Sequence, residues 1–343
     1  MILAHESRSV WGRKEKQEGL KIWRVGILGT FLYTPLAPTY PLWLKKALDQ
    51  FRPEIIHAHL PNLSAFWLLL LKPQVPLVIH WHADVVPSKI DRRLLRAYRF
   101  YRPFERALLK QARAIIVTSP PYLLSSRPLT PFRNKCHIIP LGLDSQRLYR
   151  PKPQEIALVQ KKWPRLVLGV GRLTYYKGFE FLIEAIQAVE KTYLIIVGTG
   201  QQYNFLQKKI KKLKLQNRVF LSGSLSNKDL HLLLAACQVF CLPSIERTEA
   251  FGLVLLEAMA FGKPLVTTDI PGSGVSWVNQ NRHSGLVVPI ASPEALAEAL
   301  HLLLNNPSLS ESLGQNARQR FEQHFKIEIV SQKISHLYET IRG

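Results

Sequence analysis

Residues 239–268 read VFCLPSIERTEAFGLVLLEAMAFGKPLVTT, and this stretch decides both the fold class and the candidate site. Val239–Leu242 is a continuous apolar run that predicts a buried strand, and Leu265–Thr268 predicts a second one. Between them a polar loop leads into an apolar segment. This segment predicts a helix that begins near Gly252 and ends at a glycine followed by a proline. Strand, loop, helix and strand in this order indicate an α/β fold.

Two glutamates, Glu249 and Glu257, lie at different places in this pattern. Glu249 falls on the loop before the helix, beside the free backbone N–H groups of a helix N-terminus, which suit a phosphate. Glu257 falls inside an apolar helix, where a carboxylate is unfavourable unless it accepts strong hydrogen bonds, such as those of ribose hydroxyls. The pair predicts a nucleotide pocket. The alternative is two glutamates at a solvent-exposed edge, because this spacing is common by chance.

The same run resembles the Glu-x7-Glu motif of the retaining family 4 glycosyltransferases of the GT-B fold, in its flanks as well as in its carboxylates. The resemblance implies that Glu257 holds the ribose of a nucleotide diphosphate sugar. It implies that Glu249 and the backbone at Phe251, Gly252 and Leu253 hold the sugar. It also implies that the anomeric configuration is retained, and that neither a metal ion nor another cofactor takes part.

A second motif, GVGRLTYYKG over residues 169–178, leaves a predicted strand. Its glycines, Gly171 among them, allow close approach of the backbone. Arg172 and Lys177 place two cations where a diphosphate leaving group develops charge. The motif resembles the family's Gly-Arg-Leu and Lys-Gly element, whose arginine and lysine hold the donor phosphates. The alternative is two solvated cations.

A shorter signal, Gly198-Thr199-Gly200, follows the predicted strand at Tyr193–Val197. Within the resemblance, Gly198 and Gly200 belong near the donor. A glycine pair after a strand is also typical of a tight turn without any ligand, so both interpretations stay open.

Histidines end two predicted strands of the first half. His82, with Asp84 two residues later, resembles a His-x-Asp position near the transferred sugar in the family, and the alternative is a core histidine. His57, His59 and His80 lie nearby in the sequence. Because no carboxylate or cysteine stands at a suitable spacing, we do not expect any of these histidines to bind a metal ion.

The chain of 343 residues is long enough for two domains. Strand-like runs alternate with helical patterns, which predicts two Rossmann-like, doubly wound domains that face each other across a cleft. We expect an acceptor-side domain over residues 1–150, a linker to about residue 164, a donor-binding domain over 165–325, and a last helix over 326–343 that crosses back to the first domain. By the resemblance, the first domain lacks the strand, Gly-rich loop and helix with which family members open. The predicted strands are Leu20–Val25, Glu54–Ala58, Leu77–Trp81, Ala114–Thr118, His137–Pro140, Leu166–Val170, Tyr193–Val197, Arg218–Leu221, Val239–Leu242, Leu265–Thr268 and Leu286–Val288.

The net charge of +22 is uneven, because residues 1–150 carry 24 Lys and Arg against 9 Asp and Glu, and the remainder carries 22 against 15. Such a field suits a phosphate-bearing ligand, an acidic membrane or a nucleic acid. Nucleic acid is disfavoured because no recognisable binding module is present. Arginines and aromatics alternate over residues 92–106, which is typical either of a surface that docks on anionic lipid or of a solvated helix face.

No signal peptide or membrane-spanning run is recognised, which predicts a cytoplasmic location with possible peripheral contact to the inner face of a membrane. The three cysteines, Cys136, Cys237 and Cys241, show no zinc spacing.

These patterns and the resemblance together predict a hexosyltransferase that moves a mannose- or glucose-type sugar from a GDP- or UDP-linked donor. The expected acceptor is a cell-envelope glycan or a lipid-linked glycan. The second hypothesis is an inactive, truncated protein that still binds a nucleotide sugar, and an assay of donor hydrolysis or transfer separates the two.

Overall fold

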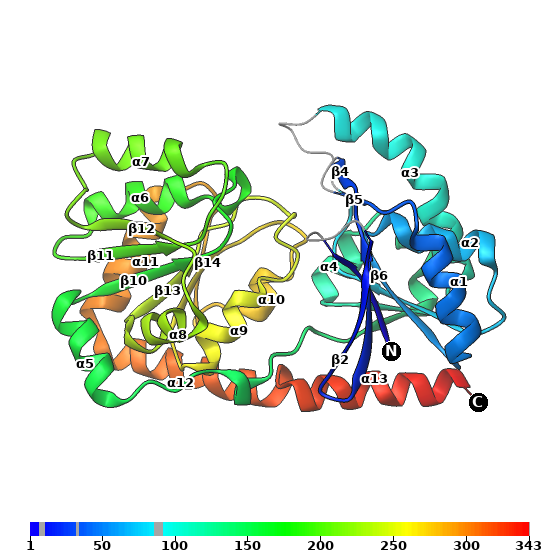
Figure 1. Ribbon diagram of the computed structural model, residues 1–343. Helices are drawn as coiled ribbons and strands as arrows, with labels where there is room; N and C mark the ends of the chain where they lie inside the picture. Colours follow the sequence, from blue (N-terminus) through cyan, green and yellow to red (C-terminus); the bar gives the residue numbers. More distant parts are fainter. Residues whose placement is uncertain (7–10, 32–33, 86–91, 343) are drawn as a thin grey trace. The chain divides into compact units, whose positions relative to one another are not determined.

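The structure is a computed structural model that describes residues 1–6, 11–31, 34–85 and 92–342 (Figure 1). The side chains of residues 31 and 92–95 lie outside this description. The chain divides into two compact units. Unit 1 comprises residues 1–117, 126–138 and 336–343, and unit 2 comprises residues 118–125 and 139–335.

Unit 2 is built on a six-stranded parallel sheet with the order β12-β11-β10-β13-β14-β15. Its strands are continuous apolar runs, as expected of a parallel sheet that helices cover on both faces. The predictions for β10, β11, β13 and β14 are confirmed to the residue, and β12 and β15 begin within one residue of the predicted position. The strands are β10 Leu166–Val170, β11 Tyr193–Val197, β12 Val219–Gly223, β13 Val239–Leu242, β14 Leu265–Thr268 and β15 Gly285–Val288.

Helices cover both faces of this sheet, and an apolar cluster fills the space on each face (Figure 1). Val167 belongs to one cluster and Leu168 to the other, because successive strand residues point to opposite faces. Unit 2 contains the helices α4 Pro120–Ser125, α5 Pro153–Lys162, α6 Phe179–Ala188, α7 Tyr203–Lys212, α8 Asn227–Ala236, α9 Leu253–Ala260, α10 Val275–Val278, α11 Pro293–Asn305 and α12 Pro307–His324.

The predicted linker before residue 165 is wrong in part, since it contains helix α5. Pro153 lies in the first turn of α5, where a missing N–H is harmless, and Glu155 accepts a hydrogen bond from the Lys152 N–H at 2.8 Å. Helix α5 packs against α8 of the same unit. The proline and the lysines of this stretch therefore begin and end a helix.

Unit 1 contains a four-stranded and a three-stranded sheet, whereas the strands predicted for the first domain implied a single sheet. Its larger sheet is parallel, with the order β6-β7-β8-β9, and contains β6 Ile56–Leu60, β7 Leu77–Trp81, β8 Ala114–Val117 and β9 Cys136–Ile138. The predicted strand at residue 20 is β3 Leu20–Gly26, which belongs to a three-stranded sheet with β1 Ile2–Glu6 and β2 Arg13–Gln17. A hairpin of β4 Gly29–Phe31 and β5 Thr34–Leu36 follows.

The sequence did not predict β1 and β2. All residues of β2, RKEKQ, are charged or polar, and β1, ILAHE, has only a short apolar run of three residues. The antiparallel pair β2-β3 turns through Glu18 and Gly19, which have φ angles of 50° and 81°. A two-residue loop with both φ angles positive is typical of a hairpin, so this glycine was the available signal.

Unit 1 also contains α1 Tyr40–Phe51, the 3₁₀ turn η1 Leu63–Phe66, α2 Trp67–Leu71, α3 Arg92–Gln111 and the end of the last helix, α13 Ile327–Arg342. Helix α13 is divided between the two units, since residues 327–335 belong to unit 2 and residues 336–343 to unit 1. Residues 139–164, which include the predicted linker, belong to unit 2. The missing opening unit stays a prediction. In the part of the chain that the structure describes, no helix has both the length and the apolar character needed to span a membrane.

Candidate active site

Glu249 lies on the loop between β13 and α9, as predicted, and its side chain is buried. Its carboxylate forms a short ion pair with the Lys177 ammonium and accepts a hydrogen bond from Ser244 Oγ at 3.0 Å. The Glu249 backbone carbonyl accepts a further hydrogen bond from Ser273 Oγ. Main chain and side chain are therefore both held in place before any ligand arrives, which is the preorganisation that an active site needs.

Lys177 lies in the 3₁₀ turn η4 Tyr175–Lys177, which follows β10, and only 8% of its surface is exposed. Gly171 makes room for it, because a Cβ at Gly171 would lie 3.1 Å from Lys177 Cε and 3.2 Å from its Nζ. The structure thus brings Gly171, Lys177 and Glu249 together at the ends of the neighbouring strands β10 and β13.

Arg172 is exposed, and its guanidinium donates to the Tyr176 hydroxyl at 3.1 Å. Arg172 and Lys177 both follow β10, but their surroundings differ. Lys177 is buried in an ion pair with Glu249, whereas Arg172 faces solvent. An exposed, loosely held guanidinium suits a group that meets an anionic ligand on arrival.

Gly198 and Gly200 lie against the backbone of the loop that follows β10. A Cβ at Gly198 would lie 2.0 Å from the Gly171 carbonyl oxygen, and one at Gly200 would lie 2.4 Å from that of Leu173. The Gly198 N–H already donates to the Gly223 carbonyl at 2.8 Å. The close approach of two loops explains both glycines, and their contact with the donor stays a prediction.

Helix α9 begins at Leu253 with Gly252 as its N-cap residue, at φ +78°. Among the described residues no side chain caps the first turn of α9; the Leu255 N–H donates to the Gly252 carbonyl at 2.8 Å, and the N–H groups of Leu253 and Val254 suit an anionic ligand. The Phe251 side chain is buried and packs on Trp277 and Phe325, so only its backbone can serve the site. These positions agree with a backbone role for Phe251, Gly252 and Leu253.

Glu257 lies in α9, as predicted, and burial raises the pKa of its carboxyl above the usual value. Its Oε2 atom is buried and has no hydrogen-bond partner among the described residues. A buried carboxylate oxygen without a donor is unfavourable by about 1–3 kcal/mol or more, so the absent donor is best supplied by a ligand hydroxyl.

His82 lies in unit 1, directly after β7, so it belongs to a different unit from the other candidate residues. Its Nε2 is 2.7 Å from His59 Nδ1, and burial, followed by the neighbouring His59, lowers its pKa to about 4. The Asp84 carboxylate binds Trp81 Nε1 at 2.8 Å and Ser126 Oγ at 2.7 Å. Asp84 therefore anchors the loop, and His59 is the partner of His82 that sequence reasoning missed.

Ser244 and Ser273 are the other site residues that sequence reasoning missed, although both bind Glu249. Ser244 comes two residues after β13, and its carbonyl accepts from the Thr268 hydroxyl at the end of β14. Polar residues directly after neighbouring parallel strands were the available signal, because such strand ends meet at one edge of the sheet.

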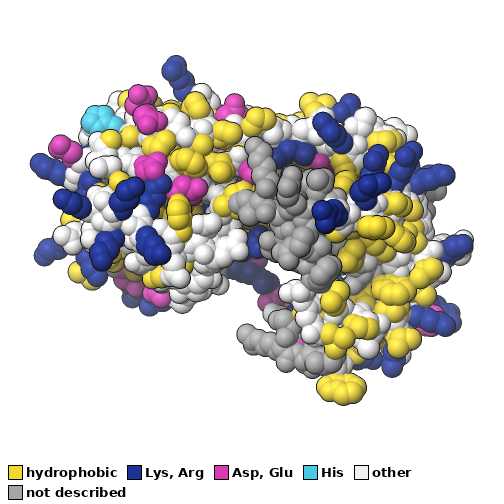
Figure 2. Space-filling model, turned by 90° about the horizontal axis from the view of Figure 1, so that it is seen from above, with side chains coloured by type: hydrophobic (Ala, Val, Ile, Leu, Met, Phe, Trp, Pro, Cys, Tyr) yellow, Lys and Arg dark blue, Asp and Glu magenta, His cyan; other side chains and the backbone are white. Residues whose placement is uncertain are grey.

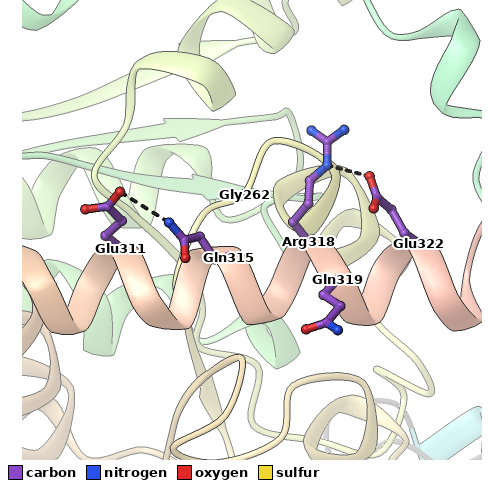
Figure 3. Close-up of a pocket in the computed structure, with 6 residues that line it drawn as sticks. All are labelled: Gly262, Glu311, Gln315, Arg318, Gln319 and Glu322. Carbon is purple, nitrogen blue, oxygen red and sulfur yellow. Dashed lines mark hydrogen bonds and ion pairs between the residues drawn. The ribbon is translucent and has the colours of Figure 1, made fainter.

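A hollow of about 420 Å³ lies on the surface of α12 and is drawn in Figure 3. Its polar groups satisfy one another, since Arg318 binds Glu322 at 2.9 Å and Gln315 binds Glu311 at 3.3 Å. None of the predicted site residues lines it, and we assign it no function. Its lining residues are Gly262, Glu311, Gln315, Arg318, Gln319 and Glu322.

Two family models together match most of the chain. The model described as glycosyl transferases group 1 matches residues 153–320, and the one described as glycosyl transferase 4-like domain matches residues 2–142. The first match contains the buried ion pair, the uncapped helix and Glu257. The chain belongs to the group 1 glycosyltransferases of the GT-B fold and is an enzyme that transfers a glycosyl group.

Two curated relatives are named as glycosyltransferases. O-antigen chain mannosyltransferase C of Escherichia coli is 32% identical over 302 residues, which is 86% of this chain and 79% of that protein. D-rhamnosyltransferase WbpZ of Pseudomonas aeruginosa is 34% identical over 251 residues, which is 73% of this chain and 64% of that protein.

Solved structures with the same fold are similar over nearly the whole chain. Sucrose-phosphate synthase of Thermosynechococcus elongatus has a TM-score of 0.78 at 24% identity and covers 95% of this chain and 84% of its own. Anabaena HepE, solved with UDP and glucose, has a TM-score of 0.76 at 19% identity and covers 99% of both chains. These likenesses confirm the fold class.

Proposed function

We propose that this chain moves a hexose from a nucleotide diphosphate sugar to a glycan or lipid-linked glycan, with retention of the anomeric configuration. The observation that carries the proposal is the half-buried Glu257 carboxylate of α9, whose Oε2 atom is buried and has no hydrogen-bond partner among the described residues. It lies in the same helix whose uncapped N-terminus follows the Glu249–Lys177 pair. Carboxylate, free N–H groups and cations are what ribose, sugar and diphosphate require.

Each residue has a separate task in this proposal. Glu257 accepts the hydrogen bonds of the ribose hydroxyls, and Glu249 accepts those of the transferred sugar. Arg172 and Lys177 stabilise the negative charge that develops on the departing diphosphate, which is usually the largest electrostatic contribution in such a step. His82 lies beside the transferred sugar. No metal ion or other cofactor is required for the transfer, because these two cations take the place of one.

The relatives support the choice of sugar and acceptor. One relative is named as a mannosyltransferase of an O-antigen chain and another as a D-rhamnosyltransferase, whereas the HepE structure holds UDP and glucose. We therefore propose a GDP-linked mannose-type donor first and UDP-linked glucose second, with a cell-envelope glycan as acceptor.

Peripheral contact with an anionic membrane is part of the same proposal. On α3, Phe100 and Phe104 expose 77% and 52% of their surfaces, and the neighbouring Arg96 and Arg99 are exposed. Figure 2 shows hydrophobic and basic side chains next to one another on the part of the molecule that carries α3. Aromatics and arginines on one exposed helix suit the headgroup region of a membrane.

The test is a thermal-shift screen of the whole chain against GDP, UDP and their sugars, followed by mass spectrometry of an acceptor incubated with the best donor. A ligand that binds only the folded state raises the melting temperature, so the nucleotide that the protein binds is the one that raises it. We expect one base to raise it in the parent and to lose that effect in Glu257→Ala. A protein that binds the donor without transferring or hydrolysing it would support the second hypothesis, and a protein that binds neither nucleotide contradicts the proposal.

A further inference from the structure

Four histidines lie together where β6 and β7 run side by side in unit 1. His57 and His59 are two residues apart on β6, and His80 lies on β7 with His82 directly after that strand. Residues two apart on a strand point to the same face, and the parallel register places His59 beside His80. The sequence therefore puts four imidazoles on one face of two neighbouring strands.

The rings of three of these histidines stack on one another, with interplanar angles of 11° to 22°. Ring centroids lie 4.8 Å apart for His57 and His59, 5.1 Å for His59 and His80, and 5.4 Å for His57 and His80. One ring nitrogen of each residue lies within 4.8 Å of one from each of the others. Among the described residues, these three form the group of histidine, cysteine or carboxylate side chains that lie close enough together to hold a metal ion.

Three buried ring nitrogens in this cluster have no hydrogen-bond partner among the described residues. They are His57 Nε2 and both nitrogens of His80, whose exposed fraction is only 5%. Such orphaned groups are rare in folded proteins, and each one requires a partner that the polypeptide does not supply. Burial, reinforced by the neighbouring histidines, lowers the pKa of His57 to about 4 and that of His80 to about 2.

Tyr338 supplies an oriented support for this cluster. Its hydroxyl lies 2.5 Å from His57 Nδ1, on the opposite side of the ring from the unpartnered Nε2. A histidine that binds a metal ion through one nitrogen almost always hydrogen-bonds an oxygen through the other. Helix α13 thus holds the His57 ring in the orientation that a ligand needs.

We propose that His57, His59 and His80 bind one divalent transition metal ion of the kind that prefers imidazole, with Zn²⁺ as the first candidate and a water molecule completing the site. Three histidines and an open position are an established zinc donor set, so the lack of a carboxylate or cysteine does not exclude it. Tetrahedral Zn–N bonds place the nitrogens about 3.3 Å apart, with the ion in the plane of each ring, so the stacked rings both turn and approach one another on binding. The proposed site adjoins His82, because His59 Nδ1 lies 2.7 Å from His82 Nε2, but the transfer proposed above does not use the metal ion.

The competing explanation is a core of neutral histidines whose nitrogens bind water. The two explanations differ in stoichiometry, since only a metal site binds one equivalent of ion with an affinity that depends on all three rings. They also differ at Tyr338, because loss of its hydroxyl matters to a metal ligand and hardly to a hydrated cluster.

The test uses the full chain without a histidine tag, stripped by a chelator and titrated with Zn²⁺ by calorimetry, and with Co²⁺ to detect the visible absorption of a tetrahedral ion. We expect one equivalent to bind to the parent and to His137→Gln, a control on an exposed histidine of β9 in the same unit. We expect no binding to His80→Leu, and an affinity about 10–100-fold lower for Tyr338→Phe. If His80→Leu does not fold, His59→Gln replaces it, because His59 is exposed. The proposal is overturned if the parent takes up no equivalent, or if the folded ligand variants bind as the parent does.

Discussion

The buried ion pair between Lys177 and Glu249 gives the sharpest prediction on stability. Both side chains are about one-tenth exposed, and the carboxylate also accepts a hydrogen bond from Ser244 Oγ. Removing one member of such a pair leaves the other charge buried without compensation. Lys177→Met and Glu249→Leu should therefore each destabilise unit 2 by about 3–5 kcal/mol.

The double variant should recover most of this loss, because replacing a whole buried pair by apolar side chains of similar volume is often neutral. For a unit of this size, each kcal/mol shifts the melting temperature by about 2–4 °C, so each single variant should melt roughly 6–20 °C below the parent. The double variant should melt within a few degrees of it.

The measurement is a double-mutant cycle in urea and by calorimetry, with the exposed i,i+4 pair Arg318 and Glu322 as a matched control. The control pair should couple by less than about 1 kcal/mol. The reasoning is refuted if the losses of Lys177→Met and Glu249→Leu simply add, or if neither exceeds that of the control.

Four further predictions concern ligands. Glu249→Gln should abolish transfer and leave nucleotide affinity within a few fold, whereas Glu257→Ala should weaken the nucleotide itself; equal losses of affinity in isothermal titration would refute this division of roles. Arg172→Ala should lower the turnover number by about a hundredfold. Withdrawing Mg²⁺ and Mn²⁺ from the assay should leave the rate of transfer unchanged. An absolute requirement for either ion would contradict the proposal that Arg172 and Lys177 stabilise the charge of the departing diphosphate. Arg96→Gln with Arg99→Gln should weaken sedimentation with anionic vesicles at low salt by about 1 kcal/mol per residue and leave binding to neutral vesicles unaltered.

The pH dependence of stability offers one more test at Glu257. Its folded pKa is raised by burial, so the folded state binds the proton more tightly than the unfolded chain does. The stability that this group contributes is present below the unfolded pKa and is lost as pH rises through the folded value. Glu257→Gln should therefore raise the melting temperature of the ligand-free protein at pH 8 and change it little at pH 4.5. An equal shift of the melting temperature at both pH values would show that burial of the charged Glu257 carboxylate does not destabilise the folded protein.

The strands of unit 2 were predictable because each is a continuous apolar run. Such a run is typical of a strand that is buried on both faces of a parallel sheet. Strands β1 and β2 were not, because residues such as Lys14 and Glu15 reveal a strand only through partners that the sequence does not show. In the folded unit, Lys14 lies over the Trp23 ring and Glu15 pairs with Arg24 at 2.7 Å. Helix α5 was missed because Pro153 is equally typical of a linker and of a helix start.

The candidate site was predictable only one residue at a time. Glu249 and Glu257 carried a signal because loop and helix positions follow from local patterns. The ion pair from Lys177 to Glu249 joins residues 72 positions apart, and nothing local indicates that the two charges neutralise each other. The histidine cluster was missed for a similar reason, since the register between β6 and β7 is what places His59 beside His80.

The neutral Lys177–Glu249 pair has a consequence for selectivity. The chain carries a net charge of +22 and draws small anions from its surroundings. A bare buried ammonium would retain any of them, free phosphate included, and an enzyme so occupied would turn over slowly. Glu249 prevents this, because an anion alone must displace a carboxylate that Ser244 Oγ holds, on a residue whose backbone carbonyl Ser273 Oγ holds. A ligand that brings hydroxyl groups for the carboxylate together with phosphates for the cation satisfies both partners at once, so the pair discriminates a whole donor from its fragments.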